Sequence, residues 1–146
     1  MALRTKACAR AQAFIRNAMR HSNGQLPPGA PQFTKAMSTL RTLRGMLTNS
    51  LRRYEQCMND PQTLAGLDFQ TLITLTKVEA SELAAQTVMS AMRACGLSGY
   101  RNDSEYSIGR HLRDVLSSPI MINNDRILAN LATPVLMSPV ATSLRD

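Results

Sequence analysis

Apolar residues recur at three- and four-residue steps along most of the chain, the spacing that places them on one face of an α-helix. The clearest repeat predicts a helix over about residues 32–59, roughly 40 Å long at 1.5 Å per residue. Its apolar positions are Phe33, Ala36, Met37, Leu40, Leu43, Leu47, Leu51, Tyr54 and Met58. The basic residues fall outside this stripe and are expected on the exposed side: Lys35, Arg41, Arg52 and Arg53.

Two further long helices are predicted on either side of this one. The first covers residues 3–21 and is followed by a loop rich in proline and glycine. The other runs from Phe69 to Cys95, and its apolar positions wrap around more than one face, which indicates a central helix with several neighbours. Asp60, just before a proline, is expected to cap a helix, and Gly96 is expected to end the long one.

Beyond the glycines the pattern predicts two shorter helices. Asn102 and Glu105 have the spacing of a capping box, which predicts a helix over roughly 103–117. Ser118-Pro119 is expected to start the next helix, which ends before Thr133. Residues 134–146 are expected to form a loose tail. We therefore predict an all-α domain over residues 1–133, an antiparallel four-helix-bundle-like fold with an extra short C-terminal helix.

Composition narrows the class of protein. A chain of 146 residues that is 44% hydrophobic can bury a core of its own. No apolar run approaches the ~20 residues needed to cross a bilayer, so we expect a cytoplasmic protein that does not bind membranes. Cys8, Cys57 and Cys95 are widely spaced, which indicates buried cysteines in a reducing compartment rather than a disulfide framework or a zinc site.

The net charge of +7 is unevenly placed. Residues 1–60 carry ten Lys and Arg but only two carboxylates, whereas residues 61–146 carry seven basic and eight acidic residues. A basic half suits a polyanion, such as nucleic acid, an anionic membrane or the phosphates of a nucleotide or coenzyme A, although a merely solvated basic face is commoner. We do not expect nucleic acid as a partner, because the chain has few aromatic residues for base stacking and no recognition-helix signature.

Three segments then suggest a family. Residues 93–100 read Arg-Ala-Cys-Gly-Leu-Ser-Gly-Tyr, residues 109–114 read Gly-Arg-His-Leu-Arg-Asp, and residues 120–124 read Ile-Met-Ile-Asn-Asn. In order and approximate spacing they resemble the Gln-x-x-Gly-Gly-x-Gly-Tyr, Glu-Arg-x-x-Arg-Asp and Ile-Tyr-Glu-Gly-Thr segments of the C-terminal helical domain of acyl-CoA dehydrogenases. The resemblance covers roughly residues 33–133, and the arginine-aspartate pair lies two residues further from the tyrosine than is usual.

The resemblance implies part of an FAD-dependent oxidoreductase that dehydrogenates an acyl thioester, carried on coenzyme A or on a carrier protein, between its α and β carbons. It implies partners as well: other copies of the chain, or separate flavin-binding domains that complete the site. The isolated chain is not expected to catalyse. Backbone N–H groups at a glycine turn favour a pyrophosphate. The implied cofactor-binding residues are Arg93, Gly96, Leu97, Ser98, Gly99 and Asn124.

Several positions depart from the family pattern. Arg93 replaces the usual glutamine, and Leu97 replaces the second glycine. The position of the family's usual catalytic base is Ile122, whose aliphatic side chain cannot accept a proton. Asp125, about one turn later, is the only carboxylate nearby and is the candidate substitute. The Arg-x-x-Phe-Gly segment that normally contacts FAD after the first helix is degenerate around Arg20.

The remaining charged residues are expected to have structural roles. We expect an ion pair between bundle helices from Arg110, Arg113 and Asp114, and surface charge or interhelix pairing from Lys77, Glu79 and Glu82. His111 is expected on the surface. A second function is also open, that of a non-catalytic helical oligomerisation or interaction module derived from the family, which the isoleucine at the base position favours.

Overall fold

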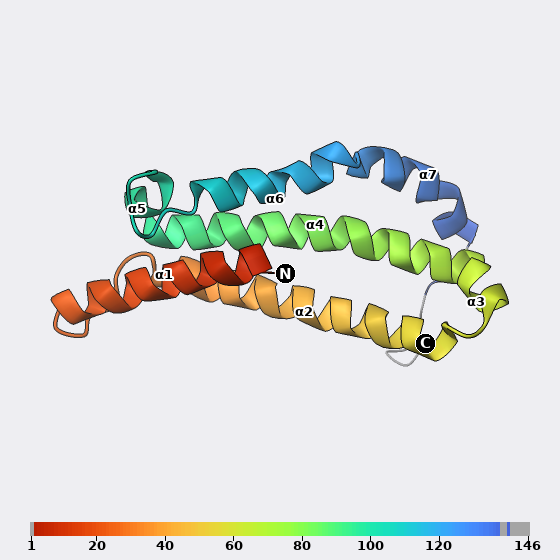
Figure 1. Cartoon of the computed structure of the whole chain (residues 1–146), viewed down its shortest axis with the longest axis horizontal. Coiled ribbons are helices and arrows are strands. Elements are labelled where there is room, and N and C mark those ends of the chain that lie inside the picture. Colours follow the sequence, from red (N-terminus) through yellow and green to blue (C-terminus); the bar gives the residue numbers. More distant parts are fainter. Residues whose placement is uncertain (1, 138–139, 141–146) are drawn as a thin grey trace.

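The computed structural model describes residues 2–137 and residue 140, and these form seven helices and no strand. The helices are α1 (Ala2–His21), α2 (Ala30–Cys57), α3 (Pro61–Ala65), α4 (Leu67–Cys95), α5 (Leu97–Tyr100), α6 (Gly109–Met121) and α7 (Asn124–Met137). The helices α1, α2, α4 and α6 run up and down beside one another, and α7 continues along α4 after α6 (Figure 1). The predicted all-α class is confirmed.

The helix α4 is the centre of the bundle. It packs against α1 and α2 on one side and against α6 and α7 on the other, with α5 at its end (Figure 1). Its buried apolar positions are mostly small, including Ala84, Val88, Ala91 and Ala94, so neighbouring helices can approach it closely. The prediction of a central helix with several neighbours is therefore confirmed.

The helices α1 and α2 form one layer, and α1 lies beside only the first part of α2 (Figure 1). Three residues of each helix join in the core: Ala7, Cys8 and Ala11 from α1, and Ala36, Leu40 and Leu43 from α2. Past the start of α1 the apolar stripe of α2 continues uncovered, with Leu51 56%, Tyr54 45% and Met58 50% exposed. The basic residues of α2 are exposed, as predicted.

Hydroxyl pairs join α2 to α4 within the apolar interface. The hydroxyl oxygens of Thr39 and Thr87 lie 2.9 Å apart, and those of Ser50 and Thr76 lie 3.0 Å apart. Buried hydroxyls cost free energy unless they are hydrogen-bonded, so these pairs favour one register of α2 against α4.

The turn after α2 follows the sequence closely. The Asp60 carboxylate accepts hydrogen bonds from the backbone N–H groups of Gln62 and Thr63, at 3.0 and 3.3 Å, and from the Thr63 hydroxyl at 2.6 Å. These bonds hold the pKa of Asp60 below its usual value. The predicted cap is confirmed, and it starts the short helix α3. The following helix, α4, begins after Gly66, two residues before the predicted start.

The predicted helix over 103–117 begins too early. Residues 101–108 form a loop, and α6 begins at Gly109 without a side-chain cap. The side chain of Ile108 is fully buried, and its N–H donates to the carbonyl of Gly99 at 2.7 Å. Burial of this isoleucine fixes the chain just before the helix, so the capping-box spacing of Asn102 and Glu105 is not used.

Pro119 and Pro134 do not mark the helix boundaries that the sequence predicts. Pro119 lies inside α6 and does not begin a helix, and the break comes at Ile122 and Asn123, where Asn123 has a φ of +50°. Pro134 lies inside α7, which continues to Met137 instead of ending before Thr133. A proline inside a helix removes one backbone donor and crowds the carbonyl four residues earlier, which kinks a helix without always ending it. The rest of the predicted loose tail, apart from residue 140, lies outside the described residues.

Cys8 and Cys95 are buried as predicted, whereas Cys57 is only partly buried. Burial raises the pKa of the Cys8 thiol, and raises that of Cys95 to about 11, so both are protonated at neutral pH. Among the helices that the structure describes, none has the combination of length and apolar composition needed to cross a membrane.

Candidate functional site

The glycine turn between α4 and α5 is a tight reversal. Gly96 ends α4 with a φ of +55°, a conformation in which residues with a side chain are strained, and its N–H donates to the carbonyl of Arg93 at 3.3 Å. Its carbonyl in turn accepts from the N–H groups of Gly99 and Tyr100, at 3.1 and 3.3 Å. A single residue, Gly96, therefore separates the long helix α4 from the four-residue helix α5.

Gly99 is needed because the backbone approaches α4 closely. A Cβ atom built on it would lie 2.8 Å from the Cβ of Cys95 and 3.0 Å from the carbonyl oxygen of Met92. The outer side of the turn is open to solvent, with Leu97 76% and Tyr100 72% exposed. The turn thus has a rigid inner side and an outer side that a partner or ligand can reach.

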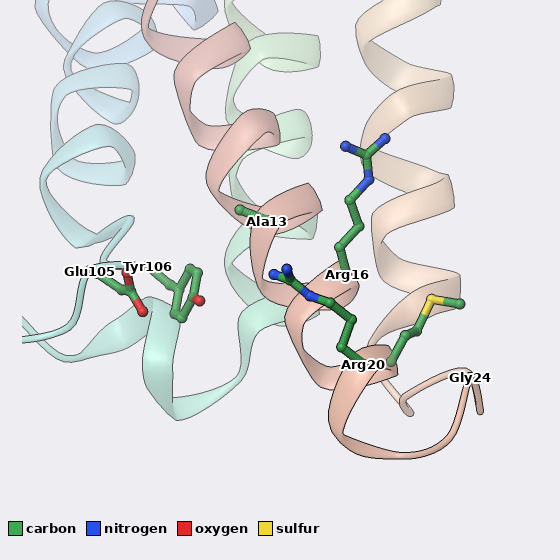
Figure 2. A pocket seen from close by; sticks show the side chains of 7 residues that line it. Ala13, Arg16, Arg20, Gly24, Glu105 and Tyr106 are labelled. Atoms are coloured by element: carbon green, nitrogen blue, oxygen red, sulfur yellow. The ribbon is translucent and has the colours of Figure 1, made fainter.

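A hollow of about 830 Å³ lies between the last turns of α1 and the loop over 101–108 (Figure 2). The end of α1 and the helix α5 lie at the same end of the bundle (Figure 1). Arg16 and Arg20 of α1 line the hollow together with Glu105 and Tyr106 of the loop. Arg20 points toward Tyr106, whereas the guanidinium of Arg16 points away from the loop, toward α2 (Figure 2). Phe14 holds the loop against α1 through an edge-to-face contact with Tyr106, with ring centroids 5.3 Å apart.

Two guanidinium groups and one carboxylate give this hollow a net positive charge. A hydrogen bond with Glu105, together with desolvation, raises the pKa of Tyr106, and the neighbouring Arg20 partly offsets that rise. Guanidinium groups bind phosphates through paired, charge-assisted hydrogen bonds. The arrangement is suited to a phosphate-bearing ligand whose apolar part lies against Met19 or the Tyr106 ring.

The segment between α6 and α7 holds the other predicted site residues. Ile122, at the end of α6, is 52% exposed, and Asp125 lies in the exposed first turn of α7. A carboxylate there interacts favourably with the helix dipole, which gives Asp125 a structural role. No general base is therefore held in an enclosed position at this break among the described residues.

Asn124 is buried, and its side-chain amide is fully used. Its Oδ1 accepts from Lys77 Nζ at 2.5 Å, and its Nδ2 donates to Ser81 Oγ at 2.8 Å and to Glu82 Oε1 at 2.9 Å. This cluster joins α7 to the middle of α4. Of the two predicted alternatives, interhelix pairing holds for Lys77 and Glu82, which both bond to Asn124 of α7, whereas Glu79 is an exposed surface charge.

The structure brings some of the predicted cofactor residues together and separates one. Arg93 and residues 96–99 lie at the end of α4, near the hollow of α1. Asn124 contacts α4 at Ser81, which is roughly 20 Å along the helix from Gly96 at 1.5 Å per residue. The turn and Asn124 therefore do not line one compact pocket.

Two predictions about α6 are wrong. His111 is buried, not exposed, and its Nδ1 has no hydrogen-bond partner. The α6 helix turns this side chain toward α1, where burial first, and then the charge of Arg10, lower its pKa. The Arg110–Asp114 ion pair, with Nε and Oδ2 3.9 Å apart, lies along α6 at its surface and does not join two helices.

The sequence matches the family described as acyl-CoA dehydrogenase, C-terminal domain, over residues 2–132. The chain belongs to this family. The match includes α1, which the motif resemblance did not cover. A search of curated proteins and a search of solved structures each found no match.

Arg16 and Arg20 line the candidate site of this acyl-CoA dehydrogenase domain, but the sequence did not predict them as cofactor-binding residues. A partial signal was present, because Arg20, Asn23 and Gly24 keep the spacing of the family's Arg-x-x-Phe-Gly segment with asparagine in place of phenylalanine. Only the packing of the loop over 101–108 against α1 shows that these arginines share a hollow.

Proposed function

We propose that this chain contributes to FAD binding and subunit assembly in an enzyme that dehydrogenates an acyl thioester between its α and β carbons. Family membership supports the reaction class. The observation that carries the cofactor assignment is that the glycine turn at 96–99 and the hollow of Arg16 and Arg20 occupy the same end of the bundle. That end combines cations with a tight backbone turn, and both suit a diphosphate.

The residues present fit the phosphate-bearing part of FAD. Arg16 and Arg20 would hold the diphosphate, and the exposed side chains of Leu97 and Tyr100 would lie against its flat, apolar part. Arg93, at the end of α4, adds a third exposed cation at this end. When bound, FAD supplies the acceptor for the hydride that leaves the β carbon.

The chain does not supply a clear base for the α-proton. Ile122 has no proton acceptor, and Asp125 is exposed to water. We therefore propose that the base comes from a partner protein that carries the flavin-binding domains. A contact between Asn124 and the cofactor stays a prediction, and it would use the backbone, because the amide is bonded within the bundle.

The test is flavin binding in two conditions. Purified chain should show no flavin absorbance near 450 nm by itself, but should gain it in complex with a protein that carries the missing domains. Replacing Arg20 by Glu should weaken that uptake by at least about tenfold, because the glutamate would repel the phosphate that the arginine attracts. Arg126→Glu, an exposed change of the same charge on α7, should leave it unchanged. Absence of flavin in both conditions would contradict the proposal.

One observation favours a second function, a non-catalytic interaction module. Where the family carries its base, this chain exposes three consecutive apolar residues: Ile120, Met121 and Ile122. Such a patch suits a subunit interface better than proton transfer. This alternative predicts stable oligomers that contain no flavin, and dehydrogenase activity in a reconstituted complex would exclude it.

A further inference from the structure

The basic charge of the chain is concentrated on one layer of the bundle. Of the ten Lys and Arg residues on α1 and α2, nine have exposed side chains, and Glu55 is the single carboxylate on these helices. Among the residues the structure describes, both ion pairs lie outside this layer, between Arg101 and Asp103 and between Arg110 and Asp114. The α1–α2 layer therefore has a strong positive charge that the bundle itself does not neutralise.

The outer face of α2 combines basic side chains with an apolar hollow, as protein-binding surfaces often do. A hollow of about 520 Å³ lies on it, lined by the basic side chains of Arg41 and Arg44 and by the apolar side chains of Met37 and Leu40. Met37 is 41% exposed, so it can be contacted from outside. A partner that fits this hollow presents an apolar side chain flanked by carboxylates, as on one face of an acidic amphipathic helix.

Other polyanions fit this face less well. Between Arg41 and Leu51 the exposed positions of α2 are polar, small or basic, namely Thr42, Arg44, Gly45, Thr48 and Asn49. The exposed apolar side chains of Met37 and Leu51 are therefore about four helical turns apart, and they do not form one continuous strip that could enter a membrane beside the arginines. A nucleic-acid backbone has no apolar group to fill the hollow between the arginines, and α2 presents no aromatic side chain near it for base stacking.

We infer that the α1–α2 layer docks an acidic helical carrier protein that presents the acyl thioester. This inference rests on the proposed function, because the thioester is the substrate assigned there. It takes a carrier protein rather than coenzyme A as the source of the acyl group, because the nine exposed cations extend along both helices, and α2 alone is roughly 40 Å long, a larger surface than the phosphates of one coenzyme would contact. The partner's carboxylates would pair with Arg41, Arg44 and the neighbouring cations, and an apolar side chain of the partner would occupy the hollow over Met37.

The experiment measures binding of a purified acyl carrier protein to the chain by titration calorimetry at 50 and 300 mM NaCl. Both the form with its phosphopantetheine arm and the form without it should bind, because the protein surface supplies the attraction. Binding should weaken at the higher salt. The double variant Arg41→Glu, Arg44→Glu should weaken it by at least about tenfold, since charge reversal at an interface replaces attraction by repulsion.

The matched control is the double variant Arg113→Glu, Arg126→Glu, which makes the same change in net charge on exposed positions of α6 and α7. It should bind the carrier protein as the unaltered chain does, and circular dichroism should show both variants folded. Equal weakening by both variants would overturn the docking site. So would binding of duplex DNA or of phosphatidylglycerol vesicles in the absence of carrier binding. If the chain supports flavin binding but does not bind the carrier protein, only this inference is overturned. A chain that binds the carrier but never supports flavin binding overturns the proposed function alone.

Discussion

Two glycines of this chain lie in opposite surroundings. Gly99 is buried against the end of α4, where an added Cβ would meet Cys95 and the carbonyl of Met92. Gly45 lies on the exposed face of α2, with no atom within 4 Å of the Cβ position. The same substitution should therefore have opposite effects at the two positions.

Gly99→Ala is expected to destabilise the chain by about 1–3 kcal/mol, the usual cost of forcing an extra carbon into packed surroundings. Gly45→Ala, the matched control, should stabilise it by about 0.5–1 kcal/mol, because alanine loses less backbone freedom in a helix. Urea unfolding followed by circular dichroism measures both. If Gly99→Ala were neutral or stabilising, the close packing of the turn on α4 would be wrong.

His111 links stability to pH. It is buried on α6, its pKa is lowered by burial and then by Arg10, and the other charged groups near it are Lys6, Arg110 and Asp114. The folded chain therefore binds the histidine proton less tightly than the unfolded chain does. Stability from this residue is complete above the usual histidine range, and it is lost as the pH falls toward the lower folded pKa.

The urea midpoint should accordingly be lower at pH 5 than at pH 7.5. Replacing His111 by leucine removes the titrating group and should reduce that difference, while His21→Leu, a change at an exposed histidine on α1, should not. An identical pH dependence in the unaltered chain and in the His111→Leu variant would assign the effect to other groups.

At the residue scale, the sequence gives part of the site and misses the rest for a physical reason. Gly96 and Gly99 were identifiable because a helix end and a close approach leave a local signature. Arg16 and Arg20 were not, because their role depends on the loop over 101–108, which lies far away in the sequence. His111 was misplaced because its neighbours along the chain are charged, whereas its neighbours in space are on α1.

At the scale of elements, α7 depends on one polar cluster. Asn124 binds Lys77, Ser81 and Glu82 at the point where α7 begins, and its side chain is buried there. Removing the amide leaves partly buried hydrogen-bonding groups of α4 without their partner, which costs free energy in addition to the lost bonds.

Asn124→Ala should lower the free energy of unfolding by about 1–3 kcal/mol. It should also speed hydrogen exchange in α7 more than in α2, because the cluster is the link between α7 and α4. Asn130→Ala, an exposed position on the same helix, is the control and should change little. Uniform loss of protection in both helices after Asn124→Ala would contradict this local role.

Long elements were predictable and their ends were less so. The periodicity of α2 and α4 sets their position within about two residues, because burial of a whole apolar face outweighs any single residue. The helix boundaries predicted near Asn102 and Pro119 are wrong. The local cap and proline signals stabilise a helix end less than the burial of Ile108 and the polar cluster at Asn124 do. A local signal predicts a helix boundary correctly where no burial or tertiary contact favours another one, as at the Asp60 cap.

At the scale of the whole molecule, the layering follows from α4. A helix that is apolar on several sides needs helices on several sides, so the bundle was predictable from this one segment. The partial overlap of α1 with α2 was not, because the apolar stripe of α2 continues past the point where α1 begins. The basic residues are concentrated in the first part of the sequence. Because α1 and α2 lie together, this basic charge is concentrated on one face of the bundle.

The central position of α4 also determines the order in which parts of the molecule unfold. The α1–α2 layer and the α6–α7 layer both rest on this helix, so its backbone amides reach water only when both layers separate. They should be the last to exchange with deuterium, at a rate set by global unfolding. The α7 helix packs mainly on α4, so it can detach while the α1–α2 layer stays in place. The lowest-energy partial opening would then expose the apolar side of α7 and leave the arginines of α1 folded.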